Sequence, residues 1–196
     1  EGEDIFFWVI VTYPEANGCG GVFSEAAKVT VLDDPLLSLP SPANQEICQA
    51  SSPECLTGTT SGGVGSYTFT WYDQDGELQQ TGPGLEIDGV MTSEFCPTTD
   101  EIGTFEYYYV VTTDALVADC ETTSASAQVI VTPGPSFVTQ PLASQTLCLG
   151  GTPEVLEVTY VDGVGLPTYQ WYVSDSCNTD PSTATLIAGA ESSSYT

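Results

Sequence analysis

Apolar and polar residues alternate along much of this chain, and the clearest alternation lies near its middle. Residues 67–72 read Tyr-Thr-Phe-Thr-Trp-Tyr, so that every second side chain is aromatic. Because successive side chains of a β-strand point to opposite faces, Tyr67, Phe69 and Trp71 are expected on one buried face. Residues 169–172 read Tyr-Gln-Trp-Tyr, which repeats the pattern. The alternation predicts two aromatic strands, with Phe69, Trp71 and Trp171 in the core.

Shorter strand-like segments recur along the chain, and turn-forming residues lie between them. These segments are rich in Val, Thr and Tyr, which favour extended backbone, whereas no segment has a convincing helical period. Asp75 and Gly76 lie between two of the segments and are expected to form a tight hairpin turn. Strands are predicted over residues 36–40, 54–60, 66–73, 77–81, 85–87, 93–95, 105–113 and 124–132.

The chain also resembles itself at an offset of about 100 residues, which indicates a tandem repeat. Residues 6–10 match residues 107–111 at an offset of 101, and residues 24–31 match residues 124–131 at an offset of 100. We expect residues 1–34 to end one repeat, residues 35–133 to form a complete one, and residues 134–196 to begin a third. The identical residues at the offset of 100 are Pro35, Gln45, Cys48, Gly63, Val64, Gly65, Trp71 and Tyr72 with their counterparts at 135, 145, 148, 163, 164, 165, 171 and 172.

A repeat of about 100 residues with seven or eight strands and a Trp on the third is typical of an immunoglobulin-like β-sandwich. The predicted fold class is therefore all-β, built from tandem immunoglobulin-like sandwiches. Asp-Asp-Pro at residues 33–35 and Pro-Gly-Pro at residues 133–135 are expected to be short, stiff joints between the repeats.

The order of the motifs resembles a known class of repeat. Gly-Val-Gly at residues 63–65 precedes the Trp strand, Gly-Thr-Phe-Glu-Tyr-Tyr-Tyr-Val-Val follows at 103–111, and Ser-x-x-Ala-x-Val-x-Val-Thr ends the repeat at 124–132. This order is similar to the Ig-like and PKD-like repeats of very large surface adhesins that bacteria export by type IX secretion, the SprB-like gliding-motility adhesins among them. The resemblance implies an extracellular stalk segment of a filamentous adhesin on the bacterial cell surface, active in gliding motility and attachment. The partners it implies are neighbouring repeats, surface polysaccharide and the gliding machinery.

The cysteines indicate an oxidising compartment. The chain has seven cysteines and no histidine, which excludes a Cys–His nucleophile and His-containing zinc sites. Cys55 and Cys96 are replaced together in the third copy, by Val155 and Thr196. Since the second and fifth strands of an immunoglobulin-like fold are antiparallel neighbours, we predict a Cys55–Cys96 disulfide.

The disulfide partners of the other cysteines are only partly defined by the sequence. Cys48 and Cys120 each have a counterpart in another copy, at Cys148 and Cys19, and form the remaining predicted pair within the complete repeat. Cys177 lies in an insertion, and its partner is left open between Cys148 and a cysteine outside the given sequence.

The charge of the chain excludes two classes of partner. It carries 27 acidic residues and one basic residue, Lys28, for a net charge of −26. Such a chain cannot neutralise phosphates, so neither nucleic-acid binding nor docking to anionic lipid is expected. No apolar run approaches the roughly 18 residues of a membrane helix, so no membrane insertion is expected. The start at Glu-Gly-Glu-Asp, without Met, is interpreted as an excision point.

The acidic residues are interpreted mainly as a solvated surface, and no cofactor is expected. Calcium is the alternative, with Asp33, Asp34 and Asp88 as its weak candidates. Residues 73–77, Asp-Gln-Asp-Gly-Glu, resemble a fragment of a calcium loop, but the remaining ligands are missing and a hairpin tip is the preferred interpretation.

The aromatic run Tyr107-Tyr108-Tyr109 has two interpretations, a sugar-binding platform or packing, and we favour packing with Tyr109 in the core. No residue is placed to activate a serine, so an enzyme is not expected. The main functional expectation is a structural stalk. The alternative is a glycan- or protein-binding module that uses its distal loops, residues 61–66 and 114–120.

Overall fold

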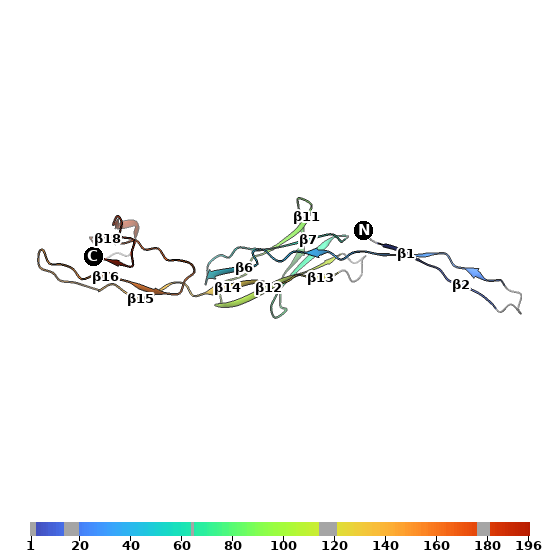
Figure 1. Cartoon of the computed structure of the whole chain (residues 1–196), viewed down its shortest axis with the longest axis horizontal. Helices are drawn as coiled ribbons and strands as arrows, with labels where there is room; N and C mark the ends of the chain where they lie inside the picture. Colours follow the sequence, from blue (N-terminus) through green and yellow to red (C-terminus); the bar gives the residue numbers. More distant parts are fainter. Residues whose placement is uncertain (1–2, 14–19, 64, 114–120, 176–180) are drawn as a thin grey trace. The chain divides into compact units, whose positions relative to one another are not determined.

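The computed structural model describes residues 3–13, 20–63, 65–113, 121–175 and 181–196 of the chain (Figure 1). Within these ranges the regular structure is β apart from one 3-10 turn, Pro181–Thr183. The all-β prediction is therefore confirmed. The chain divides into two compact units, the first of residues 1–44, 54–97 and 105–128, and the second of residues 45–53, 98–104 and 129–196.

The first unit begins with a two-stranded ribbon. In this N-terminal ribbon β1 (Glu3–Phe7) pairs antiparallel with β4 (Ala27–Val31), and β2 (Ile10–Val11) pairs with β3 (Val22–Phe23). Lys28 forms an ion pair of 2.7 Å with Asp4, and the Thr30 hydroxyl donates to the same carboxylate. These hydrogen bonds, from Lys28 first and then from Thr30, lower the pKa of Asp4. All the side chains in these four strands are exposed.

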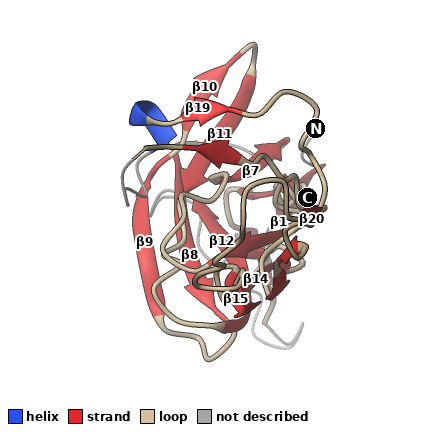
Figure 2. Ribbon diagram, turned by 90° about the vertical axis from the view of Figure 1, so that its left-hand side faces the viewer, coloured by secondary structure: helices blue, strands red, loops and turns tan. Residues whose placement is uncertain are grey.

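Two larger sheets contain the central strands, which Figure 2 draws in red. One sheet has the order β10-β11-β7-β5, and the other has the order β6-β14-β12-β8-β9, with β13 also paired to β12. The strands are β5 (Leu36–Leu37), β6 (Asn44–Cys48), β7 (Leu56–Ser61), β8 (Tyr67–Asp73), β9 (Leu78–Pro83), β10 (Leu85–Ile87), β11 (Val90–Phe95), β12 (Gly103–Thr113), β13 (Glu121–Thr123) and β14 (Ala127–Thr132).

The two sheets pack face to face through aromatic rings in the first unit. The Trp71 ring of β8 stacks on Phe95 of β11 at 5.6 Å and lies 5.0 Å from Tyr109 of β12, measured between ring centroids. Phe69 also contacts Tyr109, at 5.7 Å. Trp71 Nε1 donates a 3.0 Å hydrogen bond to Ser93 Oγ, so the buried indole N–H has a partner. Phe69, Trp71 and Tyr109 have no exposed surface, and their predicted place in the core is confirmed.

The Tyr109 hydroxyl crosses from β12 to the opposite sheet. It lies 2.8 Å from the carbonyl oxygens of Ser38 and Thr59, and it accepts a hydrogen bond of 3.1 Å from Thr59 N. Burial raises the pKa of Tyr109. Tyr107 is also buried, and burial together with the nearby Asp73 charge raises its pKa.

A disulfide joins Cys55 and Cys96, whose Cα atoms are 4.1 Å apart. The two residues flank β7 and β11, which pair antiparallel with Leu56 opposite Phe95. The structure thus contains the Cys55–Cys96 disulfide that the comparison of the sequence repeats predicts. Cys48 is a free thiol, and its predicted partner Cys120 lies outside the described residues.

Two strands of the larger sheets were not predicted. β6 has the polar sequence Asn-Gln-Glu-Ile-Cys, which lacks an alternating apolar pattern. Gln128 N donates to the carbonyl of Ala43, and Gln49 N donates to that of Thr132, so β6 runs parallel to β14. β13 is the short partner of β12 after the undescribed residues 114–120. The predicted first strand, residues 36–40, is regular only at Leu36–Leu37.

The remaining strands form three short antiparallel pairs in the second unit. β15 (Ser136–Thr139) pairs with β17 (Thr159–Val161), β16 (Leu156–Glu157) with β20 (Ser194–Tyr195), and β18 (Tyr172–Val173) with β19 (Thr185–Leu186). Trp171 stacks on Tyr195 at 5.9 Å and donates from Nε1 to the Ser192 carbonyl. Unlike Trp71, Trp171 is only half-buried, so the prediction of a core anchor holds for one of the two tryptophans.

Candidate functional site

Strand registers of the central sheets recur in the 134–196 segment. In the β5–β7 pair Leu36 lies opposite Ser61, and in the β15–β17 pair Ser136 lies opposite Val161. In the β7–β11 pair Leu56 lies opposite Phe95, and the β16–β20 pair aligns positions 156 and 195 in the same way. Each pair thus has a counterpart that lies 100 residues later.

The N-terminal ribbon has the same relationship to β12 and β13. Ile10 lies opposite Phe23, as Val110 lies opposite Thr123. Ser24 N donates to the Val9 carbonyl at 2.9 Å, and an equivalent 2.9 Å bond joins residues 124 and 109. The offset of this strand is therefore 100, and the predicted offset of 101 is wrong. Val9, and not Trp8, holds the position of Tyr109. The sequence comparison misjudged this offset because bulky aromatic residues lie on both faces of the strand, so that two alignments match equally well.

One face of the N-terminal ribbon is a continuous row of exposed apolar side chains. Its members occupy the positions that face the core in β12 and β14. Val29 and Val31 are 47% and 53% exposed, whereas Val129 and Val131 are buried. The row, which we call the ribbon face, consists of Ile5, Phe7, Val9, Val11, Ala27, Val29 and Val31.

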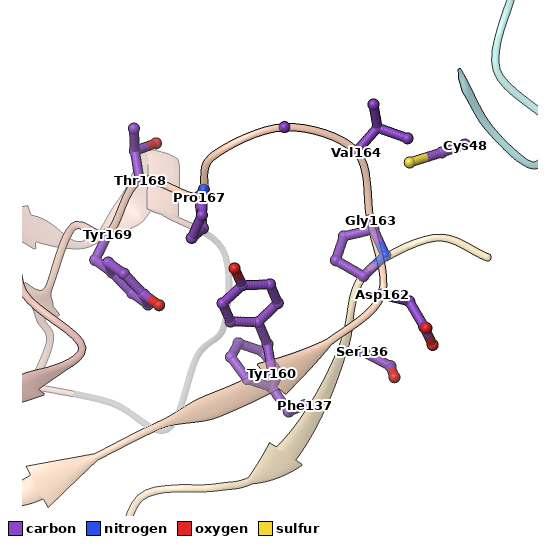
Figure 3. A pocket seen from close by; sticks show the side chains of 12 residues that line it. Cys48, Ser136, Phe137, Tyr160, Asp162, Gly163, Val164, Pro167, Thr168 and Tyr169 are labelled. Carbon is purple, nitrogen blue, oxygen red and sulfur yellow. The ribbon is translucent and has the colours of Figure 1, made fainter. Parts of the chain in front are cut away.

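The second apolar surface is a cavity in the 134–196 segment (Figure 3). Its volume is about 370 Å³. Tyr160 of β17 and Tyr169 before β18 contribute their rings, which lie 6.4 Å apart in an edge contact. Phe137 of β15 lies beside Tyr160, and the loop of residues 162–167 arches over the opening. Cys48 lies at the edge of the same cavity, next to Val164.

The counterparts of two of these residues lie in the core of the central sheets. Tyr160 and Tyr169 correspond to Thr60 and Phe69, which are 2% and 0% exposed in the central sheets. Phe69 is covered there by Tyr109 of β12. The cavity is thus lined by residues whose counterparts pack inside the central sheets. We call this surface the receptor face.

The aromatic run 107–109 serves packing, as the preferred interpretation predicts. Tyr107 and Tyr109 are 6% and 0% exposed and point into the core. Tyr108 points the other way and stacks on Tyr72 of the neighbouring strand at 5.5 Å. The run is therefore divided between the two faces of the sheet, and its rings do not form one platform.

The acidic residues in the described ranges do not gather into a metal site. Among the described residues no three His, Cys, Asp or Glu side chains lie close enough to hold a metal ion. Asp88 has a positive φ of 51° and, with Gly89, forms the tight turn between β10 and β11. The Asp73 carboxylate accepts hydrogen bonds from the backbone N–H groups of Asp75 and Glu77, so it stabilises the predicted hairpin turn between β8 and β9. Asp33 and Asp34 lie in the joint before β5.

Of the two distal loops that the binding alternative uses, residues 114–120 lie outside the described part. The 61–66 loop has glycines with positive φ at 62, 63 and 65, which suits a tight connection from β7 to β8. No helix in the described ranges has the length and apolarity to cross a bilayer. Comparison of the sequence with protein-family models and with curated proteins finds no match.

Proposed function

We propose that the chain is a segment of a tandem array of immunoglobulin-like β-sandwich modules, and that the array is the stalk of a large extracellular adhesin. In this proposal residues 35–133 are one complete module, residues 1–34 end the preceding module, and residues 134–196 begin the next. The observation that carries the proposal is the recurrence of strand registers 100 residues apart, in β5–β7 and β15–β17 and in β7–β11 and β16–β20.

Three properties suit a stalk outside the cell. The Cys55–Cys96 disulfide fits an oxidising, extracellular environment and ties neighbouring strands of the complete module together. The net charge of −26 makes neighbouring filaments repel one another and keeps an array extended. The Pro-containing joints at 33–35 and 133–135 restrict bending between modules.

The resemblance of the motif order at residues 63–72 and 103–111 to type IX-secreted adhesins supports a more specific role. On that basis the protein lies on the bacterial cell surface and takes part in gliding motility and attachment. Its partners are then the neighbouring modules of its own chain and, at the ends of the filament, the gliding machinery or surface polysaccharide.

The test is to locate the protein on intact cells of the source organism. An antibody raised against residues 35–133 is expected to label unpermeabilised cells, and immunogold particles are expected at a distance from the outer membrane. Labelling that requires permeabilisation would contradict the proposal. A glycan array probed with the purified chain separates the stalk from the binding alternative, because sugar binding that is lost when the 61–66 loop is changed would favour a binding module.

A further inference from the structure

We propose that the Gly-Val-Gly loop of each module is a docking element, which holds the linker in front of its own module and contacts the end of the preceding module. In this chain the loop is residues 163–165, and the preceding module is residues 35–133. The docking role rests on the tandem array of the proposed function, and it adds to that function how one module is fixed to the next.

Two consecutive carbonyl groups at the joint bind to different modules. β14 ends at Thr132, whose carbonyl accepts a hydrogen bond of 2.8 Å from Gln49 N, directly after β6 of the complete module. The next carbonyl, that of Pro133, accepts a hydrogen bond of 3.1 Å from Gly163 N in the loop. The loop is therefore tied to the first linker residue after the complete module.

The first glycine of the loop also packs against the linker proline. A Cβ on Gly163 would lie 3.2 Å from Cβ of Pro135 and 3.5 Å from its Cδ. The joint in front of the complete module has the same arrangement, since a Cβ on Gly63 would lie 3.4 Å from Cβ of Pro35. The φ angles of Gly163 and Gly63 are positive, 89° and 67°, which other residues adopt only with strain. At position 163 glycine thus serves both the backbone conformation and the close approach of the proline.

The middle residue of the loop lies beside the preceding module. Val164 is next to Cys48, the last residue of β6, at one edge of the cavity (Figure 3). Both residues belong to the second compact unit, which combines residues 45–53 and 98–104 of the complete module with residues 129–196. The contact removes apolar surface of the valine and of the thiol from water, which favours the docked arrangement.

Most of the residues that the copies share lie at this joint. Eight residues are identical at the offset of 100, and two of them, Trp71 and Tyr72, belong to the aromatic strand β8. Five of the other six are the linker proline, the last residue of β6 and the three residues of the loop, which are Pro35, Cys48, Gly63, Val64 and Gly65. Val64 itself lies outside the described residues. The identity of these five residues between copies is explained if every joint is built in the same way.

Docking of this kind limits bending of the array more than the linker alone does. Prolines restrict the backbone of the linker, whereas the hydrogen bond to Pro133 and the contact of Val164 with Cys48 hold one module against the next. In this arrangement the 61–66 loop has a structural role at a joint, in contrast to the ligand binding that the alternative function assigns to it.

The Cys48 thiol reports whether the joint is closed. Its rate of alkylation by iodoacetamide is measured in the purified full chain by mass spectrometry, and cleavage after Glu46 and Glu54 isolates it in residues 47–54. Val164→Asn replaces the contacting side chain by a neutral polar one and is expected to raise this rate about fivefold or more. Leu166→Asn is the matched control, since Leu166 is 97% exposed in the same loop, and its rate is expected to match that of the unmodified chain.

A pair of glycine variants tests the linker contact without changing a neighbour of the thiol. The φ angles of Gly163 and Gly165 are 89° and 85°, so valine is strained at either position. A Cβ at Gly165 meets no atom within 4 Å, whereas a Cβ at Gly163 meets Pro135. Gly163→Val is expected to undock the loop and to raise the alkylation rate of Cys48 about fivefold or more, and Gly165→Val is expected to change it less than about twofold.

Urea unfolding followed by tryptophan fluorescence shows that each variant keeps the folded core around Trp71. Unchanged alkylation in folded Val164→Asn and Gly163→Val would overturn the docking role. Equal increases in each variant and its control would also overturn it, because general loosening of the loop would then be the cause. These rates are independent of where the protein lies on the cell, which the antibody labelling tests, so the docking role and the stalk function can fail separately.

Discussion

The Tyr109 ring lies directly over Gly58 of the opposite sheet. A Cβ placed on Gly58 would stand 2.6 Å from Cε1 of Tyr109 and 2.8 Å from two further ring carbons. Atoms of this kind do not approach so closely in folded proteins, so any side chain at position 58 must displace the ring. The ring is also held at its far end, where its hydroxyl is hydrogen-bonded to Ser38 and Thr59. The lack of a side chain at Gly58 and the position of the Tyr109 ring therefore depend on each other.

Gly58→Val is expected to lower the free energy of unfolding by about 3 kcal/mol, which is typical of overpacking a well-filled core. The extra side chain has to push a ring that is fixed by hydrogen bonds on a buried strand. Urea unfolding of the full chain, followed by tryptophan fluorescence, measures the loss. Gly62→Ala is a comparison site at which a Cβ meets no atom within 4 Å, although its φ of 71° adds some strain of its own.

A double-mutant cycle checks that the Tyr109 ring is the cause. Tyr109→Val alone is expected to destabilise by roughly 3–5 kcal/mol, because it leaves a cavity. When Gly58→Val is added to it, the new side chain enters that space, so the double variant is expected to be more stable than the sum of the single effects predicts by about 1 kcal/mol or more. Strict additivity would show that the strain at position 58 has another origin.

Tyr109→Phe isolates the contribution of the buried hydroxyl. The substitution keeps the ring and leaves Thr59 N and two carbonyl groups without this partner. We expect a loss of about 1–3 kcal/mol in the free energy of unfolding. Tyr108→Phe is the matched control, since Tyr108 lies on the outer face of the same strand, and its change is expected to stay within about 0.5 kcal/mol. Comparable losses in the two variants would contradict the role assigned to the hydroxyl.

Thr60→Val is expected to stabilise the protein. Thr60 is 2% exposed on β7, and its hydroxyl has no hydrogen-bond partner. Valine has nearly the same shape and removes a buried polar group, so a gain of about 1 kcal/mol is expected. Thr60→Ser keeps the unpartnered hydroxyl and loses the methyl group, and it is expected to destabilise. If valine lowered the urea midpoint, the hydroxyl would have to make a stabilising contact in solution.

The strands with the strongest patterns were predictable from the sequence alone. β8 and β12 alternate large apolar side chains with polar or outward-facing ones, and their predicted ranges differ from the structure by at most two residues at either end. The Cys55–Cys96 pair was predictable because both cysteines are absent from the third copy. In each case the signal lies in residue types that have one strongly favoured environment.

Other features depend on contacts that the sequence pattern does not contain. β6 is a polar strand that forms because β14 offers it backbone hydrogen bonds, and its own residues give no periodic signal. The register of the N-terminal ribbon was misjudged by one residue because Phe6, Phe7 and Trp8 suit either face. Ser24 N donates to the Val9 carbonyl and Ser24 Oγ accepts from Val9 N, and Ser124 has the same two hydrogen bonds with Tyr109, which settles that register. The receptor face could be identified only in the structure, where Tyr160 and Tyr169 line one cavity.

Removal of the disulfide is expected to reduce the stability of the complete module. Cys55 and Cys96 are 41 residues apart, and closing a loop of this length restricts the unfolded chain by an amount equivalent to about 4 kcal/mol. The variant Cys55→Val with Cys96→Thr introduces the residues that the third copy has at these positions. Its urea midpoint is expected to fall and to become insensitive to reducing agent. Cys48→Ser removes a free thiol instead and is expected to change the midpoint little.

Stability is expected to fall at alkaline pH because of two buried tyrosines. Burial raises the pKa of Tyr109, and burial with the Asp73 charge raises that of Tyr107, above the value of about 10 in the unfolded chain. The contribution of the two tyrosines to the free energy of unfolding is complete below pH 10. It is lost as the pH rises through 10 towards the pKa values of the folded protein, and the free energy of unfolding then falls by up to about 1.4 kcal/mol per pH unit for each tyrosine. Urea midpoints across this range measure the slope. The double variant Tyr107→Phe with Tyr109→Phe is expected to flatten it, and an unchanged slope in that variant would assign the alkaline loss to other groups.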